Sequence, residues 1–386
     1  MFGPVRADRG MVRRLGQRQR IRFGHRSRHP PSDGVHDYPA PSKPNRADSA
    51  VASPKSFAIE LLDQDRISRC DIWVAQRWWQ DLPPVAGSFV MATGIVSVGL
   101  HLTGFEVVSW LIFALAAAVW LLLAIDFGTR LLWHRSQWEA EADTPPALTG
   151  VAATTVFGTR LSLSGWQIVA CALLVLAAAI WPGLLLAVLR HWNRRMAGGA
   201  FLVCVSTQGL AVLAGTLARA DVGDWLGWVA LALFCIGVLL YLAAFAHFDI
   251  RQVWIGAGDQ WVATGALAIS TLAAAELVGA HQWTGAAHRL LEVVVLIVLG
   301  LNLFGYTILM VAEVIRPRPE YDIRRWATVF PLGMTAVATL TTSTAIDLPA
   351  LCALGDLLLL VAVGAWALTF AVLLADRTTF ESDRSA

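Results

Sequence analysis

Residues 107–127 read VVSWLIFALAAAVWLLLAIDF, and this stretch decides the fold class. Its single charged residue is Asp126, near the end. An α-helix rises about 1.5 Å per residue, so a stretch of this length covers about 30 Å, the thickness of the hydrocarbon core of a bilayer. The stretch therefore predicts a helix that crosses a membrane.

Nine other stretches of the chain are similarly apolar. The ten predicted spans are 85–104, 107–127, 147–164, 166–189, 199–218, 225–246, 260–279, 287–313, 325–346 and 349–375. Of the 386 residues, 56% are hydrophobic and 15% are charged. This balance excludes a soluble enzyme core and a nucleic-acid-binding body, and it indicates an all-α integral membrane protein.

Charge divides the chain into a basic tail and an apolar body. Residues 1–84 have a net charge of +6, whereas residues 85–386 have a net charge of −4. The tail is rich in Arg, Pro, Ser and Gly, so it is predicted to be largely disordered, or to be an over-extended gene start. An interfacial helix or a solvated linker is expected within residues 56–81. The predicted domains are thus a cytoplasmic tail at 1–84, a transmembrane domain at 85–376 and a short cytoplasmic tail at 377–386.

Arginines in the predicted loops indicate the orientation. With the basic tail in the cytoplasm, the inner loops carry ten arginines and the outer side receives three, Arg160, Arg219 and Arg289. Cytoplasmic loops of membrane proteins are enriched in Lys and Arg. Because ten spans place both ends of the chain on one side, both termini are expected in the cytoplasm. The expected location is the cell membrane.

Polar residues alternate from span to span. The odd-numbered spans carry Thr, Ser, Gly and Gln, whereas the even-numbered spans are mostly Leu, Ala, Val and Ile. This alternation predicts five helical hairpins, with five inner helices that line a pore and five outer helices that face lipid. The alternative is that the polar groups satisfy backbone carbonyls or join helices. The residues predicted to line the pore are Thr93, Gly94, Ser97, Thr154, Gly158, Thr207, Gln208, Thr264, Gly265, Thr271, Thr335 and Thr339.

Five segments, one in each odd-numbered span, resemble the tellurite-resistance/dicarboxylate transporter family. This family also includes the slow anion channels of plant guard cells and the fungal malate permeases. The most specific segment is YDIRRWATVFPLGMTAVATL at 321–340, which looks like the family's ninth span. The others are FVMATGIVSVG at 89–99, VAATTVFG at 151–158, VCVSTQGLAVLAGT at 203–216 and WVATGALAISTLAAA at 261–275. The five follow the order of the family, and the resemblance covers roughly 84–375.

The resemblance implies a ten-helix protein that forms a homotrimer with a separate pore in each protomer. It implies transport of anions, either organic dicarboxylates such as malate or small inorganic anions such as chloride, nitrate, sulfite or tellurite. It also implies that Phe330, followed by Pro331, plugs the pore near mid-membrane. The expected partners are small anions and the lipid bilayer. No nucleic acid, cofactor, metal site or catalytic residue is expected.

Phe330 is interpreted as a pore gate, with ordinary packing as the alternative. A bulky ring in a narrow apolar pore blocks it and disfavours wetting, and Pro331 permits a kink beside the ring. A stripe of threonines that includes Thr335 and Thr339 lies on a different face of the same span. Either the kink changes the phase of the helix, or the stripe packs against a neighbour while Phe330 faces the pore. The other odd-numbered spans carry Gly in place of the Pro found in some relatives, which leaves pore width and substrate size open.

Three charged residues are candidates for a role in transport. Arg160 attracts anions at the pore mouth or snorkels to the interface, and snorkelling is the favoured interpretation. Asp356 and Glu276 couple transport to protons, or they are paired or interfacial. Channel and proton-coupled carrier therefore both stay open. The alternative function is a membrane-embedded enzyme, or a sensor whose basic tail binds lipid or a partner. Most histidines lie in the tail, in loops or near span ends, which disfavours the enzyme.

Overall fold

The computed structural model describes residues 86–133, 144–192, 195–317 and 322–385. The predicted basic tail, with its interfacial helix or linker, lies outside the described residues. The described part of the chain is helical and contains no strand, apart from an isolated bridge between Met196 and Phe248. The predicted all-α fold is therefore confirmed.

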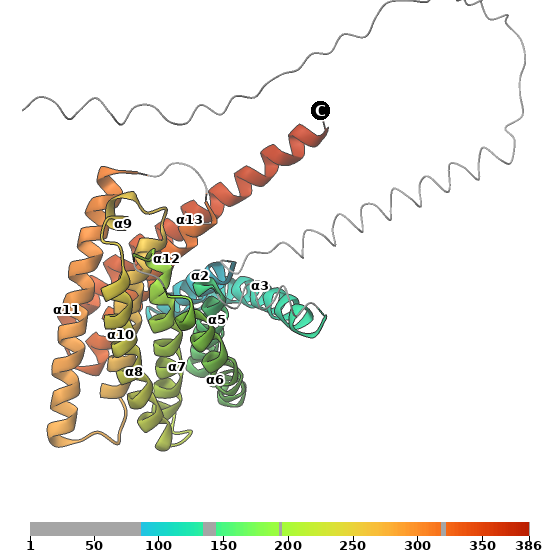
Figure 1. Ribbon diagram of the computed structural model, residues 1–386. Coiled ribbons are helices and arrows are strands. Elements are labelled where there is room, and N and C mark those ends of the chain that lie inside the picture. The colour runs from blue at the N-terminus through green and yellow to red at the C-terminus, as the bar shows by residue number, and fades with distance from the viewer. Residues whose placement is uncertain (1–85, 134–143, 193–194, 318–321, 386) are drawn as a thin grey trace, which may run out of the picture. The chain divides into compact units, whose positions relative to one another are not determined.

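Ten long helices make up the described part of the chain, one for each predicted span (Figure 1). The helices of the odd-numbered spans are α2 (Gly87–Leu102), α5 (Thr149–Leu163), α7 (Leu202–Arg219), α10 (Val262–Val278) and α12 (Trp326–Ala345). The helices of the even-numbered spans are α3 (Glu106–Trp133), α6 (Gln167–Arg190), α8 (Trp225–His247), α11 (Gly285–Ile315) and α13 (Pro349–Ser385). Each helix of the first set forms a hairpin with the helix of the second set that follows it.

Short elements connect the hairpins. Four helices of the first set are preceded by a 3₁₀ turn, namely η2 (Pro145–Leu148), η3 (Gly198–Phe201), η4 (Asp259–Trp261) and η5 (Ile323–Arg325). The single turn α9 (Gln252–Ile255) follows α8. At the other end of the chain α13 continues to Ser385, whereas the predicted span ends at 375. The residues predicted as a short tail thus extend this helix, because hydropathy marks where the lipid ends and not where the helix ends.

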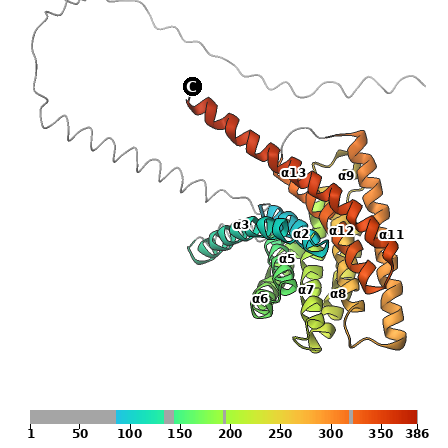
Figure 2. The same cartoon turned by 180° about the vertical axis from the view of Figure 1, so that it is seen from behind.

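The five helices of the first set form a closed ring, and we call them the inner helices. Contacts join α2 to α5, α5 to α7, α7 to α10, α10 to α12, and α12 back to α2. We call the five helices of the second set the outer helices. Each outer helix contacts the inner helix that precedes it in the chain and the inner helix that follows it, and α13, the last, contacts α12 and α2. Figure 2 shows α13 in front of α12. The inner helices run in parallel, because each outer helix brings the chain back before the next inner helix begins.

Burial separates the inner from the outer helices. In its most apolar window, the stretch Gly198–Arg219 that contains α7 is buried at every residue, whereas the window in α8 is 22% buried. Outer helices expose large apolar side chains on their outward sides, such as Leu239 and Leu360, which are 66% and 69% exposed. This outward surface has the composition that contact with lipid requires.

Seven of the described helices are long and apolar enough to cross a membrane by length and composition alone, and α2, α5 and α12 are not among them. Helices α2 and α5 have 16 and 15 residues, and α12 is rich in Thr. All three are inner helices that protein surrounds. They therefore need less length and less apolar surface than a helix that faces lipid.

Polar side chains of four outer helices, α3, α6, α11 and α13, join their hairpins to the next inner helix. The indole nitrogens of Trp120, Trp181 and Trp366 donate hydrogen bonds of 3.0–3.1 Å, and the side-chain amide of Asn302 donates one of 3.3 Å. Their acceptors are the hydroxyl oxygens of Thr154 in α5, Thr207 in α7, Thr93 in α2 and Thr335 in α12, respectively. Because an unpaired N–H is costly in an apolar medium, these bonds favour the closed ring.

Candidate functional site

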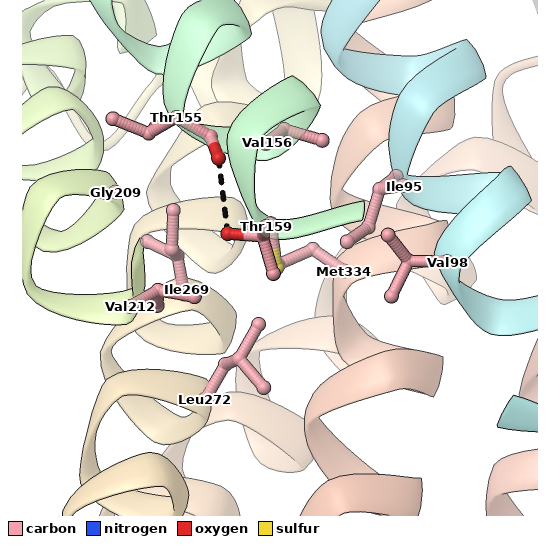
Figure 3. A pocket seen from close by; sticks show the side chains of 10 residues that line it. All are labelled: Ile95, Val98, Thr155, Val156, Thr159, Gly209, Val212, Ile269, Leu272 and Met334. Atoms are coloured by element: carbon pink, nitrogen blue, oxygen red, sulfur yellow. Dashed lines mark hydrogen bonds between the residues drawn. The ribbon is translucent and has the colours of Figure 1, made fainter. Parts of the chain in front are cut away.

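A small cavity lies inside the ring, and all five inner helices line it (Figure 3). Its ten lining residues are Ile95 and Val98 of α2, Thr155, Val156 and Thr159 of α5, Gly209 and Val212 of α7, Ile269 and Leu272 of α10, and Met334 of α12. The cavity has a volume of about 10 Å³, roughly the room that one water molecule needs. The ten lining residues include no charged side chain, so any solute in this cavity meets a mostly apolar wall.

Thr155 and Thr159 are the polar residues of this lining. The hydroxyl of Thr159 donates to the carbonyl of Thr155 over 2.9 Å, as Figure 3 shows, and the hydroxyl of Thr155 donates to the carbonyl of Ala152 over 2.8 Å. Both hydroxyl protons therefore point at the helix itself, and each oxygen keeps acceptor capacity. Gly209 packs against Thr155 so closely that a Cβ would stand 2.3 Å from its Oγ1. A residue without a side chain is thus needed where α7 approaches α5.

The ring of Phe330 lies one helical turn before the cavity. Phe330 precedes Met334 by four residues on α12, and Gly265 precedes Ile269 by four residues on α10, so each lies on the cavity-facing side of its helix. Phe330 is 1% exposed. Its Cε1 and Cδ1 atoms lie 3.2 and 3.4 Å from the position that a Cβ of Gly265 would occupy. The aromatic ring therefore lies directly against α10, where any side chain at 265 would compete with it.

Helix α12 runs through Pro331 as one helix from Trp326 to Ala345. The stripe of threonines on this helix faces elsewhere, because Thr335 accepts a hydrogen bond from Asn302 of α11. The contact of Thr335 with α11 is what the second explanation for the phase of Phe330 expects, in which the threonine stripe packs against a neighbouring helix. Phe330 lies four residues before Met334 on the same helix.

None of the twelve residues predicted to line the pore is among the ten that line the cavity. Four of them accept hydrogen bonds from outer helices, namely Thr93, Thr154, Thr207 and Thr335. Two others also turn outward, since Ser97 donates to the carbonyl of Ser109 in α3 and Gln208 donates to the carbonyl of Phe234 in α8. These six side chains make the contacts with outer helices that the packing alternative describes, and their lining of the pore stays a prediction.

The other six predicted residues are three threonines and three glycines of the inner helices. The hydroxyls of Thr264, Thr271 and Thr339 donate to carbonyls of their own chain segments. Two glycines allow close helix contacts: a Cβ at Gly94 would stand 3.0 Å from Val156, and one at Gly158 would stand 2.7 Å from Leu213. Gly265 lies beside Phe330.

A different pattern marks the cavity. Pairs of lining residues three apart recur in four inner helices, as Ile95 with Val98, Val156 with Thr159, Gly209 with Val212, and Ile269 with Leu272. Residues three apart share a helix face. This spacing of small and apolar residues within otherwise polar spans is the signal that polarity alone missed.

Arg160 is fully buried between α2, α3 and α5, with 0% of its surface exposed. Its Nε and Nη2 atoms donate to the hydroxyl of Ser109 over 3.2 and 3.0 Å, and Nη1 donates to Ser164. Its guanidinium lies 4.8 Å from the ring centre of Trp110, and Nη2 lies 3.6 Å from a carboxylate oxygen of Glu106. Arg160 is therefore enclosed by protein and is not among the ten residues that line the cavity. Its attraction of anions at the pore mouth stays a prediction, with snorkelling as the alternative.

The two acidic candidates lie in different surroundings. Glu276 is buried near the end of α10, and its Oε2 lies 3.1 Å from Nη1 of Arg219 in α7. Asp356 is exposed on α13, beside Leu357, which is 58% exposed. Glu276 is therefore paired and close to the ring, whereas Asp356 lies on an outer helix. Proton coupling through either residue stays a prediction.

The family model for voltage-dependent anion channels matches residues 81–374 of the chain. None of the curated proteins matches this chain. The matched residues run from just before α2 into α13, so they contain the whole ring and the cavity inside it. The match confirms the resemblance drawn from the odd-numbered spans, because the slow anion channels belong to the same family. The chain therefore belongs to the voltage-dependent anion channel family.

Proposed function

We propose that the protein is a channel for small anions, that the anions pass between the five inner helices, and that Phe330 closes this path. The observation that carries the proposal is the cavity that all five inner helices line, with Phe330 one turn before it on the same face of α12. Membership of the family supports anion transport in general. A bulky ring in a narrow apolar passage blocks ions sterically and excludes water.

The lining favours anions that give up their water easily. An ion that enters a narrow pore loses hydration and needs donors or positive potential in return. The ten lining residues contain no cation, and the two hydroxyl protons are engaged with carbonyls. Among the candidate substrates we therefore expect the singly charged chloride and nitrate to pass faster than malate, with its two carboxylates. Sulfite and tellurite are the other two candidate anions whose flux is to be compared.

We also propose that the protein lies in the cell membrane as a homotrimer with both termini in the cytoplasm. Ten long helices bring the two ends of the transmembrane domain to the same side. Arginines gather before the inner helices, as Arg251 does before α10 and Arg324 and Arg325 do before α12. Such loops are typically cytoplasmic. The apolar outward sides of the outer helices suit contact with lipid and with neighbouring protomers.

Phe330→Ala tests the proposal, with Phe157→Ala as its control. Phe157 also lies on an inner helix, but its ring stacks on Phe113 and Trp120 of α3, at centroid distances of 4.8 and 5.1 Å. Each full-length protein is reconstituted into vesicles, and the flux of each anion is measured with and without a proton gradient. Phe330→Ala is expected to raise chloride flux several-fold, because the ring no longer fills the path. Phe157→Ala is expected to leave flux per folded molecule unchanged.

Each result of this experiment separates two interpretations. Flux that stays unchanged in a folded Phe330→Ala protein contradicts the gate. Saturable flux that requires the proton gradient contradicts the channel and favours a carrier. A folded protein that passes none of the anions, with or without Phe330, contradicts anion transport itself.

A further inference from the structure

Glu276 of α10 and Arg219 of α7 form an ion pair near the C-terminal ends of their helices. On α10, Glu276 follows the lining residues Ile269 and Leu272 by seven and four positions. On α7, Arg219 follows the lining residue Val212 by seven positions. Residues four or seven apart lie on one helix face. Both members of the pair thus continue the lining toward the C-terminal ends of their helices.

The two partners differ in their access to solvent. The side chain of Glu276 is 5% exposed, whereas that of Arg219 is 36% exposed. Two glycines make room for them: a Cβ at Gly215 would stand 2.8 Å from Cβ of Glu276, and one at Gly279 would stand 2.7 Å from Nε of Arg219. The carboxylate is therefore enclosed between α7 and α10, and the guanidinium lies at the rim.

Arg219 keeps donors that a ligand can use. A guanidinium has five N–H groups in a planar fork. Within the described residues, Arg219 gives one hydrogen bond from its guanidinium, the 3.1 Å bond from Nη1 to Glu276. The remaining N–H groups suit a small anion, since the planar fork can bind two oxygens of one oxyanion in parallel.

The surroundings of this end of the ring disfavour anions unless a cation is present. The inner helices run in parallel, so their C-terminal ends, which carry negative partial charge, lie at the same end of the ring. Glu276 adds a full negative charge there. Arg160 offers no compensation to an anion in the path, because it is 0% exposed. Arg219 supplies the cation, and an approaching anion can reach it because its side chain is 36% exposed.

We propose that Arg219, held at the rim by Glu276, is an anion-binding site at the C-terminal end of the path, with small singly charged anions as its ligands. Glu276 competes with the anion for the guanidinium and so keeps binding weak. Weak binding is what conduction requires, because a tightly held ion does not leave. This inference rests on the proposed function.

The test compares wild type with three variants of the full-length protein in vesicles, at chloride concentrations below saturation. Glu276→Gln keeps the cation and removes its competitor. The double variant Arg219→Gln/Glu276→Gln removes both charges, and it avoids the enclosed, unpaired carboxylate that Arg219→Gln alone would leave. Arg289→Gln is the matched control, because Arg289 is exposed near the start of the outer helix α11, on the same side as the ends of the inner helices.

Glu276→Gln is expected to give about three- to tenfold more chloride flux than the double variant, with a difference that shrinks at high ionic strength. Arg289→Gln is expected to match wild type. Equal flux from Glu276→Gln and the double variant would show that the pair only joins α7 to α10, and would overturn the site while wild-type flux leaves the proposed function intact. An absence of anion flux that persists when Phe330→Ala opens the path overturns both.

Discussion

The two sides of the inner helices differ in polarity, and the apolar side is the one that faces the cavity, whereas the wall of an aqueous pore would be expected to be polar. The cavity side is mostly apolar, with residues such as Val98, Val212 and Leu272. The side toward the outer helices carries hydroxyl and amide groups, such as Thr154 and Gln208, which are hydrogen-bonded to that layer. Polar groups inside a membrane need partners, and the outer helices supply them. Polarity in these helices thus indicates how hairpins are joined, while apolar spacing indicates the cavity.

Two ion pairs extend this comparison to charge. Arg160 is completely enclosed, and its partner Glu106 is 50% exposed. In the second pair the exposure is reversed, since Arg219 is 36% exposed and Glu276 is 5% exposed. The enclosed arginine joins three helices, whereas the accessible one has donors to spare. Substitutions on the outward side should therefore change stability, and substitutions on the cavity side that alter the size or the charge of the path should change flux.

Arg160→Gln should have the largest effect on stability. The change removes the hydrogen bonds to Ser109 and Ser164 and the pairing with Glu106. Leaving buried polar groups without their hydrogen-bond partner costs about 1–3 kcal/mol of unfolding free energy. The measurement is the melting temperature and the yield of monodisperse protein, with Thr159→Val, on the cavity side of the same helix, as control. An Arg160→Gln protein that melts like wild type but loses flux would place Arg160 on the anion path.

The bond between Trp120 and Thr154 should have an intermediate effect. A double-mutant cycle of Trp120→Phe with Thr154→Val is expected to give a coupling free energy of about 0.6 kcal/mol, the average for such bonds in membrane proteins. The control cycle pairs Trp120→Phe with Thr155→Val, whose hydroxyl faces the cavity, and should give none. Flux per folded molecule should not change in the first cycle. Equal coupling in both cycles would remove the distinction between the two sides of α5.

Thr155→Val and Thr159→Val should have the smallest effect, a change in chloride flux of less than about twofold. Both hydroxyl protons are donated to backbone carbonyls, so a passing anion gains little from them. Flux assays of the two single variants in vesicles measure this directly. A loss of most of the flux from either variant would mean that the hydroxyl rotates to serve the anion.

The ten helices and their pairing into hairpins could be predicted from the sequence, because length and apolarity mark a span and alternation of polarity marks its layer. The direction of each side chain could not. Periodicity states which residues of a helix share a face, but the neighbours decide which face turns inward. Thr154 and Thr155 are adjacent in the chain, yet one binds Trp120 and the other lines the cavity.

The charged residues illustrate the same limit. Arg160 looked like a residue of the pore mouth, but its surroundings come from Ser109 and Glu106 on another helix. Arg219 looked like an ordinary loop arginine, and its partner Glu276 lies 57 residues further along the chain. Pairings over such separations depend on the closed ring, which no local pattern in one span expresses.

The central claim is that anions pass between the inner helices, and a thiol label placed inside the ring tests it most directly. The five native cysteines, Cys70, Cys171, Cys204, Cys235 and Cys352, are first replaced, and Phe330→Ala opens the path. Val212→Cys then places one thiol on the cavity, and Thr154→Cys places one on the outward side as control. A bulky, negatively charged thiosulfonate is added, mass spectrometry measures its attachment, and chloride flux is recorded. Labelling at Val212→Cys is predicted to abolish flux, with little effect at Thr154→Cys. Undiminished flux through a fully labelled Val212→Cys protein would contradict a path through this ring.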